Sequence, residues 1–272
     1  MSSSTFHALS ADAYESFMGR WSRRLSGPFI EFAGIADGET IIDVGCGTGS
    51  LTMAIASAAN ITGVVGIDLS EVYLKHAKGN TNDARIAFLK GDATALAFPD
   101  AKFDRAMSML VLQFVPEADR AIQEMKRVVR PGGVVAAAVW DGYGGIPALR
   151  MFWDVAANLG LASDIDLKGF LFRPMSQPGE LAAAWTRHGL IDVVHSSMTI
   201  RMEYASFADY WGPIASGDAA LGKFATSLAQ VERGARERSA HVVFRRNARW
   251  ATLVRSNDMG VQGPSPVRRC VG

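Results

Sequence analysis

The chain has 272 residues, of which 49% are hydrophobic and 20% are charged, as is ordinary for a soluble globular protein. Its formal net charge of +1 gives no electrostatic case for binding nucleic acid through the phosphate backbone. Two cysteines, Cys46 and Cys270, are too few for a disulfide framework and suit a reducing compartment. The N-terminus lacks a signal-peptide pattern, and the longest apolar run, residues 134–140, is too short to span a bilayer. We therefore expect a cytoplasmic protein without a membrane span.

Residues 13–32 predict helical structure. Large apolar side chains recur there at three- and four-residue steps: Tyr14, Phe17, Met18, Trp21 and Leu25. The Gly27-Pro28 dipeptide predicts a break between two helical segments.

From residue 40 onward, short expected strands alternate with helical segments, beginning with the β-branched run at residues 40–44. The expected strands are residues 40–44, 64–68, 85–90, 103–109 and 134–140. The expected helices are residues 50–59, 71–79 and 119–129, and Ser70 is suited to cap the second of them. This alternation predicts βαβ units, a mostly parallel sheet and helices on both of its faces.

The pattern is weaker beyond residue 140. A glycine-rich loop is expected at residues 141–145, an extended segment at 190–203, and helices at 147–161, 179–188, from 207 and over 221–238. Arginines are frequent from about residue 230, and hydrophobic periodicity is poor beyond Asn257, which predicts a solvated tail.

The strongest motif is Asp43-Val-Gly-Cys-Gly-Thr-Gly49, which follows an expected strand and precedes an expected helix. Its glycines permit a tight turn and the close approach of a ligand, and the following helix offers free N–H groups. The dinucleotide pattern G-x-G-x-x-G does not fit, because position 50 is Ser50, and the lysine of a phosphate-binding P-loop is absent. Asp43 would repel a pyrophosphate but could hold a cationic or hydroxyl-bearing ligand.

Two more acidic residues follow the next two expected strands. Asp68 is placed to accept hydrogen bonds from ribose hydroxyls. Asp92, within Gly91-Asp92-Ala93, could recognise an adenine amino group together with a backbone N–H that recognises a ring nitrogen. A nucleotide-like cofactor is therefore expected.

The order and spacing of these motifs resemble class I S-adenosylmethionine-dependent methyltransferases. The likeness rests on the glycine-rich motif, Asp68, Gly91-Asp92-Ala93, Phe103-Asp104 and Pro131-Gly-Gly133, and covers about residues 13–140. The run is similar to the group that includes ubiquinone and menaquinone biosynthesis methyltransferases, with a methyltransferase type 11 domain. The resemblance implies S-adenosylmethionine as cofactor and a small molecule as methyl acceptor.

The resemblance also implies roles for individual residues. The cofactor-binding set is Asp43, Gly45, Cys46, Gly47, Asp68, Leu69, Asp92, Ala93 and Met109. The set implied to contact substrate or to form the lid is Tyr14, Met18, Trp21, Gln113 and Trp140. Methyl transfer from a sulfonium mainly needs alignment of the reactants, so no catalytic residue is assigned. The five histidines show no metal-ligand spacing, and no metal site is expected.

The expected architecture is α/β: a doubly wound, mostly parallel, seven-stranded-type Rossmann-like sheet with an N-terminal helix and a helical lid insertion. Residues 1–37 would form the N-terminal helical cap, 38–140 the cofactor-binding core, and 141–229 the substrate lid with the remaining core elements. Residues 230–272 would form an atypical arginine-rich segment, partly disordered, and the protein would be a monomer or homodimer. Similar proteins end in a strand antiparallel to the fifth one; residues 241–244 and 251–254 are the candidates, although arginines surround both.

Two alternatives to a methyltransferase exist on the same fold. A short-chain oxidoreductase on the same scaffold needs a Tyr-x-x-x-Lys pair, which the chain lacks. A non-catalytic S-adenosylmethionine-binding or regulatory protein stays open, because methyl transfer has no signature base.

Overall fold

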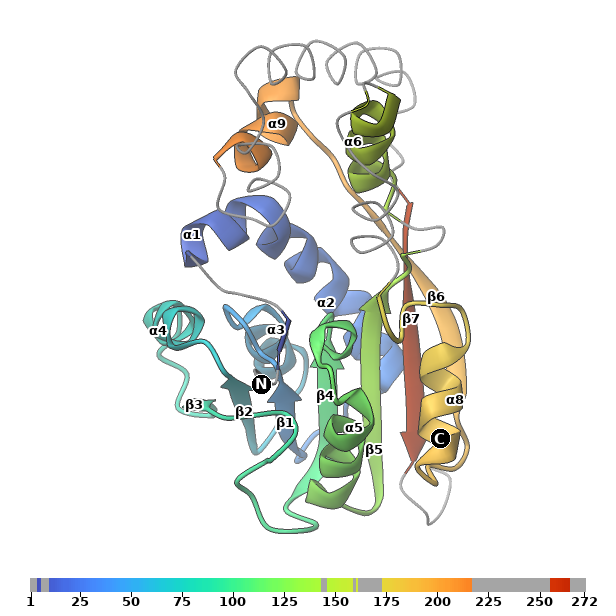
Figure 1. Cartoon of the computed structure of the whole chain (residues 1–272). Coiled ribbons are helices and arrows are strands. Elements are labelled where there is room, and N and C mark those ends of the chain that lie inside the picture. Colours follow the sequence, from blue (N-terminus) through green and yellow to red (C-terminus); the bar gives the residue numbers. More distant parts are fainter. Residues whose placement is uncertain are drawn as a thin grey trace.

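The computed structural model describes residues 4–5, 10–142, 146–158, 160 and 173–216, and the backbone of residues 255–264. Its centre is a seven-stranded sheet in the order β3-β2-β1-β4-β5-β7-β6 (Figure 1). Five neighbouring strands are parallel: β1 (Thr40–Val44), β2 (Gly63–Asp68), β3 (Ile86–Lys90), β4 (Phe103–Met109) and β5 (Val129–Trp140). This arrangement confirms the expected mostly parallel, Rossmann-like sheet.

The sheet continues beyond β5 with one reversed strand. β7 (Arg255–Pro264) pairs antiparallel with β5 and also with β6 (Val194–Arg201), which forms the edge. Both sequence candidates for the reversed strand lie outside the described residues, and β7 begins after them. The solvated tail expected beyond Asn257 is wrong as far as Pro264, because pairing on both sides holds this backbone in the sheet. The segment contains Gly260 and Gly263, and glycine is depleted in strands, so its residue types do not indicate a strand.

Helices cover both faces of the sheet. Alternate side chains of each strand point to opposite faces, so Val135, Ala137 and Val139 belong to one core while Ala136 and Ala138 belong to the other. The first core is covered by α5 (Ala118–Val128) and α8 (Glu180–Arg187), and the second by α2 (Arg20–Ala33) and α3 (Ser50–Ala58). α4 (Glu71–Gly79), capped by Ser70 as expected, packs near β3. The expected elements between residues 40 and 140 are thereby confirmed to within a few residues.

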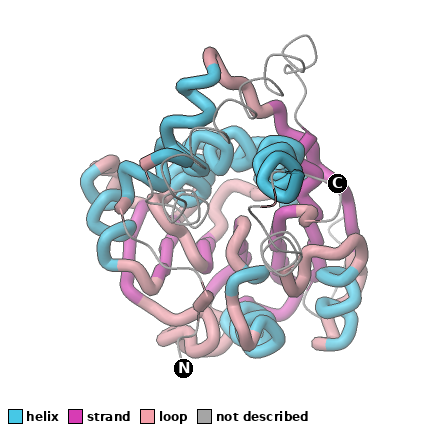
Figure 2. Tube along the Cα trace, turned by 45° about the horizontal axis from the view of Figure 1, so that its top comes forward, coloured by secondary structure: helices cyan, strands magenta, loops and turns pink. Residues whose placement is uncertain are grey.

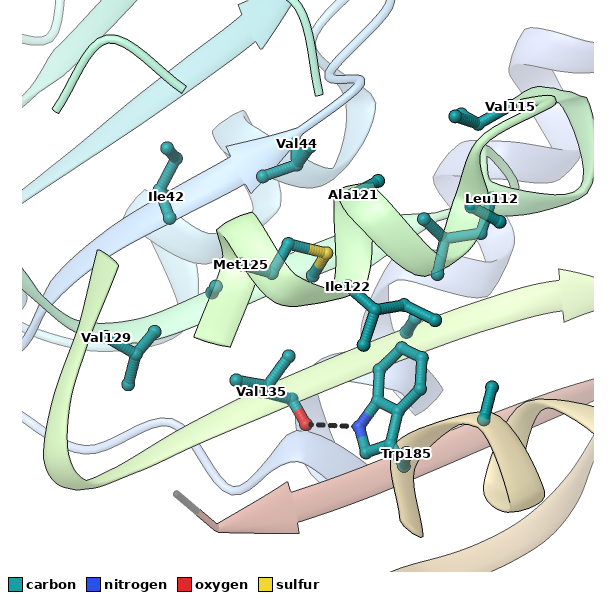
Figure 3. Close-up of a cluster of buried hydrophobic side chains, with 14 of the residues drawn as sticks. Ile42, Val44, Leu112, Val115, Ala121, Ile122, Met125, Val129, Val135 and Trp185 are labelled. Atoms are coloured by element: carbon teal, nitrogen blue, oxygen red, sulfur yellow. Dashed lines mark hydrogen bonds between the residues drawn. The ribbon is translucent and has the colours of Figure 1, made fainter. Parts of the chain in front are cut away.

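A tryptophan packs in the core beneath α5 and α8 (Figure 3). Trp185 is fully buried, and its indole Nε1 donates a hydrogen bond of 3.2 Å to the carbonyl oxygen of Val135. Ile122 and Met125 of α5 belong to the same cluster. α8 is thus fixed to β5 both by apolar burial and by one directional contact.

The N-terminal helix differs from expectation. α1 (Ala11–Tyr14) passes into a π-helical turn, η1 (Glu15–Gly19), and then into α2, which contains Pro28. The expected break at Gly27-Pro28 is wrong, because burial of Leu25, Phe29 and Ala33 keeps the helix continuous through the proline. α2 ends at Gly34, whose φ of 67° is the left-handed conformation of a C-terminal cap.

Two further helices lie beyond the carboxyl ends of the parallel strands, as Figures 1 and 2 show: α6 (Pro147–Asn158) and α9 (Phe207–Ala215). They form an apolar cluster that includes Phe152, Trp153 and Tyr210. Phe152 and Trp153 are therefore core residues. The expected helix at residues 221–238 lies outside the described residues. No helix in the described ranges is long and apolar enough to cross a membrane.

Candidate functional site

The glycine-rich turn lies at the carboxyl edge of the sheet, between β1 and α3. The backbone N–H groups of Gly45 and Cys46 donate to the carbonyl oxygen of Ile67, at 2.8 and 2.9 Å. These bonds tie the turn to the end of β2. Gly45, Gly47 and Gly49 all have positive φ, of 79°, 54° and 89°, which explains the need for glycine.

The glycines of the turn have different surroundings. A Cβ added to Gly45 would lie 2.4 Å from the side chain of Val111, so Gly45 is required for packing. At Gly47, a Cβ would meet nothing within 4 Å in the described structure. Gly47 therefore presents bare backbone to open space, as a ligand-binding turn does.

Asp43 is a buried carboxyl group beneath the turn. Its Oδ2 accepts a hydrogen bond of 2.6 Å from the Thr52 hydroxyl. Its Oδ1 is buried and has no hydrogen-bond partner among the residues described. Burial raises the pKa of Asp43 to about 7, and the nearby charge of Asp68 acts in the same direction. The site thus contains an acceptor atom that a cationic or hydroxyl-bearing ligand would satisfy.

Asp68 ends β2 and faces the same turn. One carboxylate oxygen accepts from the Gly47 N–H at 2.9 Å, and the other from the Ser70 N–H at 2.8 Å. Burial raises the pKa of Asp68. Its charge contributes to the raised pKa values of Tyr14 and Tyr73, whose rings lie 5.1 Å apart and whose main perturbation is burial. The N-terminal helix therefore reaches the ribose-binding position expected from the sequence.

Glu15 joins the N-terminal helix to the glycine-rich turn. The Thr48 hydroxyl donates to the Glu15 carboxylate, which also pairs with Arg23. Sequence reasoning did not identify Glu15 or Thr48. The π-helical turn that directs Glu15 towards Thr48 has no simple sequence pattern; π-helical turns often occur at functional sites.

The expected adenine-binding residues follow β2 and β3 at the same edge. Leu69 is exposed at 40% although it is apolar. Asp92 uses Oδ1 to accept from both the N–H and the hydroxyl of Thr94, at 2.8 Å each, which fixes the loop after β3. The neighbouring Ala93 is half-buried and packs against the core.

Strained backbone marks the end of β4. Met109 is buried, and its sulfur lies 3.9 Å from the Ser26 hydroxyl. The next residue, Leu110, has φ of 65°, which is rare for a branched side chain, and its N–H donates to the carbonyl oxygen of Ala138 at 2.7 Å. Such strain is concentrated at functional sites. Leu110 was not identified from the sequence, because nothing in its residue type signals a positive φ.

Gln113 and Trp140 meet at the same edge. The backbone N–H of Trp140 donates to Oε1 of Gln113 at 2.7 Å, and both residues are buried. Trp140 belongs to one apolar cluster with Met109 and Trp21, and Met18 packs against that cluster. The structure thus brings most of the expected lid residues together above β4 and β5, whereas Tyr14 lies nearer Asp68.

Arg20 connects the N-terminal helix to α9. Its guanidinium pairs with Asp209 at 2.7 Å and lies over the rings of Trp21 and Tyr204, with centroid distances of 4.5 and 5.0 Å. This contact holds the N-terminal helix and the helical segment after β5 against each other.

Other candidates lie away from this edge or lack a reactive environment. Asp104 accepts from the Thr40 N–H and from Arg130, both at 2.6 Å, and fastens the amino ends of the strands. Cys46 is buried, and burial raises its thiol pKa well above the ordinary value. Within the part of the chain that the structure describes, no group of three or more His, Cys, Asp or Glu side chains could hold a metal ion.

A glycine-rich turn and an acidic strand end at the carboxyl edge of a parallel sheet define a Rossmann-like cofactor-binding domain. Residues 42–137 match a family model described as a methyltransferase domain. These residues therefore resemble a methyltransferase domain, and solved structures that share the fold contain S-adenosylmethionine or S-adenosylhomocysteine.

Three curated relatives are methyltransferases whose names state different acceptors. Demethylmenaquinone methyltransferase from Bacillus licheniformis is 39% identical over 108 residues, which are 39% of this chain and 47% of the relative. Malonyl-[acyl-carrier protein] O-methyltransferase from Erwinia pyrifoliae is 38% identical over 106 residues, 39% of each chain. Sterol 24-C-methyltransferase from Pneumocystis carinii is 34% identical over 113 residues, 40% of this chain and 29% of the relative. The chain spans less than half the length of each relative.

Solved structures share the fold over most of the chain. Phosphoethanolamine N-methyltransferase 2 from Haemonchus contortus, in complex with phosphomonomethylethanolamine and S-adenosylhomocysteine, has a TM-score of 0.60 at 16% identity. The match covers 94% of this chain and 57% of that one. The [4+2]-cyclase SpnF has a TM-score of 0.56 at 20% identity, covering 90% and 82%. Because a cyclase shares the fold, the fold alone does not determine the reaction.

Proposed function

We propose that this chain binds S-adenosylmethionine at the carboxyl edge of β1, β2 and β4 and transfers its methyl group to a small-molecule acceptor. The observation that carries the proposal is the buried Oδ1 of Asp43, which has no partner in the described structure and lies beneath a turn with open backbone at Gly47. A donor-rich cation is the ligand chemistry that this acceptor suits. The methyltransferase domain at residues 42–137 supports the same conclusion.

The residues at this edge fit the parts of such a cofactor. Asp43 would face its positively charged amino acid end. The two oxygens of Asp68 accept from Gly47 and Ser70, and a carboxylate oxygen can accept more than one bond, so ribose hydroxyls could be held there. The exposed Leu69 would pack on the adenine, with Asp92 and Ala93 beside its edge.

The chain's own contribution is alignment and exclusion of water. When bound, S-adenosylmethionine supplies a methyl group on a positively charged sulfur, which is already activated for transfer. Tyr14, Met18 and Trp21 would cover the cofactor, and Gln113 and Trp140 would border the acceptor. No residue needs to form a covalent bond.

We propose the same domain organisation that the sequence indicates. Residues 1–37 would act as the cap, 38–140 as the cofactor-binding core, 141–229 as the lid with remaining core elements, and 230–272 as an atypical arginine-rich segment. We also propose a cytoplasmic monomer or homodimer without a nucleic-acid partner, since the net charge is only +1.

Transfer of labelled methyl groups tests the proposal. The purified protein is incubated with methyl-labelled S-adenosylmethionine and a small-molecule cell extract, and label is measured in the extractable low-mass fraction. Wild type and the control Asp100→Asn, which changes an exposed carboxylate, should transfer label, whereas Asp43→Asn should transfer at least tenfold less. Binding of S-adenosylhomocysteine without any transfer would support the non-catalytic alternative. Absence of both binding and transfer would refute the proposal.

A further inference from the structure

Gln113 is a buried amide beside the expected acceptor position. It lies in a 3-10 turn, η2 (Leu112–Phe114), directly after the strained end of β4. Only 4% of its surface is exposed, and its surroundings are largely apolar: Leu112 and Trp140 are buried next to it. A polar side chain buried in such a place needs hydrogen-bond partners.

The contact with Trp140 fixes which way the amide faces. A backbone N–H can only donate, so the atom 2.7 Å from the Trp140 nitrogen must be the carbonyl oxygen Oε1 of Gln113. The amide nitrogen Nε2 is therefore the opposite end, with two N–H donors. Within the described ranges, Nε2 makes no hydrogen bond; the contact with Trp140 is the side chain's only one there.

Gln113 lies on the side of the glycine-rich turn where the acceptor is expected, and not on the side where the ribose is expected. β4 is the neighbour of β1, and β5 is the next strand outward, so the Gln113–Trp140 contact lies on the opposite side of the turn from Asp68. Met109 and Leu110, whose backbone is left-handed, lie just before Gln113 in the chain. The strained backbone holds η2 in place at this edge.

We propose that Nε2 of Gln113 donates a hydrogen bond to an oxygen atom of the methyl acceptor, next to the atom that is methylated. The inference rests on the proposed function. It selects acceptors with a carbonyl, enolic or phenolic oxygen, because these atoms accept hydrogen bonds. An ammonium group offers donors only and leaves both N–H groups of Gln113 unsatisfied. Gln113 would thus be a specificity-determining residue.

The decisive variant is Gln113→Glu. It keeps the shape and the oxygen that accepts from Trp140, but replaces the N–H donors by a second carboxylate oxygen. Gln113→Leu removes both ends of the amide and reports the packing contribution. The matched control is Gln123→Glu, because Gln123 lies exposed on α5.

The probes are 1,4-dihydroxynaphthalene, which has phenolic oxygens, and 1-naphthylmethylammonium, which has the same ring system with an ammonium group and no oxygen. Each is titrated calorimetrically into protein saturated with S-adenosylhomocysteine. Wild type and Gln123→Glu should bind 1,4-dihydroxynaphthalene and not 1-naphthylmethylammonium. Gln113→Glu and Gln113→Leu should bind it at least tenfold more weakly, with S-adenosylhomocysteine affinity unchanged within twofold.

The outcomes distinguish the proposed role of Gln113 from the proposed function of the chain. Equal affinity of Gln113→Glu and wild type for 1,4-dihydroxynaphthalene would overturn the inference. So would saturable binding of 1-naphthylmethylammonium, or failure of 1,4-dihydroxynaphthalene to bind the wild-type S-adenosylhomocysteine complex. In those cases the proposed function would stand. Failure of wild type to bind S-adenosylhomocysteine would instead contradict the proposed function itself.

Discussion

At the scale of single residues, the site depends on the carboxyl group of Asp43, whose burial lowers the stability of the folded protein. One oxygen of Asp43 is held by Thr52, and the other is buried without a partner in the described structure. A core of this kind would be more stable with a neutral residue at position 43. A buried, incompletely paired group is a common feature of ligand-binding sites, because the ligand supplies the missing contact.

Asp43 should make the stability of the unliganded protein depend on pH. Its pKa is about 7 in the folded chain and near the ordinary value of 3.8 in the unfolded chain. The folded state thus retains a proton that the unfolded state has lost, so the free energy of unfolding should fall as the pH rises from about 4 through about 7. In Asp43→Asn this fall should be smaller, and the variant should be more stable than wild type at pH 8.

Urea unfolding at pH 5 and pH 8 measures this effect. Asp68, whose pKa is also raised by burial, contributes in the same direction and remains in the variant. Asp100→Asn is the control and should keep the wild-type pH dependence. Identical pH dependence in Asp43→Asn and wild type would show that Asp43 does not titrate as described.

The open backbone at Gly47 gives a second prediction. Gly47→Ala should lower the free energy of unfolding by about 1–2 kcal/mol, because φ is positive, and should weaken cofactor binding at least tenfold by placing a methyl group over the turn. Gly38→Ala is the matched control: its φ is 80°, its Cβ would also meet nothing within 4 Å of the described structure, and it precedes β1 at the other edge. Calorimetric titration with S-adenosylhomocysteine distinguishes the two. Equal affinities would argue against a ligand over Gly47.

Several residues of the site could be identified from the sequence, and others could not. Asp43 and Asp68 could be identified from the sequence because they lie at the carboxyl ends of expected strands, at motif spacing. Glu15 could not, because it lies 33 residues from Thr48 in the chain and their contact depends on the π-helical turn that Glu15 begins. Leu110 could not, because its strained φ results from the packing of β4 and β5.

At the scale of elements, the helices are held by a few directional contacts added to apolar burial. Trp185 anchors α8 to β5 through its indole N–H, and Arg20 anchors the N-terminal helix to α9. Local patterns predicted the helices themselves but not these contacts. At Gly27-Pro28 the local pattern predicted a helix break that does not occur. Burial of Phe29 and its neighbours outweighs the local effect of the proline.

Trp185→Phe tests the anchoring of α8. The phenyl ring retains apolar burial but leaves the carbonyl oxygen of Val135 without its donor, which should lower the free energy of unfolding by about 1–3 kcal/mol. Urea denaturation measures it. Trp211→Phe, a half-buried tryptophan of α9, is the control and should cost less. A cost at Trp185 no larger than that at Trp211 would contradict the role given to the indole hydrogen bond.

At the scale of the whole molecule, the sheet is completed by a segment near the end of the chain. β7 pairs with β5 from Val134 to Trp140 and with β6 over Val194–Arg201. The βα alternation predicted the five parallel strands, since each is a short segment followed or preceded by a helical pattern along the chain. β7 could not be predicted in the same way, because its glycines and polar residues become a strand only between two preformed neighbours.

Truncation tests the place of β7 in the sheet. A chain that ends at residue 254 lacks β7 and leaves the facing edges of β5 and β6 unpaired, so its soluble yield and its melting temperature should fall sharply. A chain that ends at residue 264 retains β7 and is the control. Equal thermal stability of the two truncated chains would contradict the sheet order.

The most direct test of the central claim is calorimetric titration of S-adenosylhomocysteine into wild type, Asp68→Asn and Asp100→Asn. Asp68 holds the glycine-rich turn through Gly47 and offers the ribose acceptors, whereas Asp100 is an exposed carboxylate. We predict micromolar-range binding to wild type and Asp100→Asn, and affinity at least tenfold weaker for Asp68→Asn. Absence of binding to wild type, or equal affinity in all three, would contradict a cofactor site at this edge of the sheet.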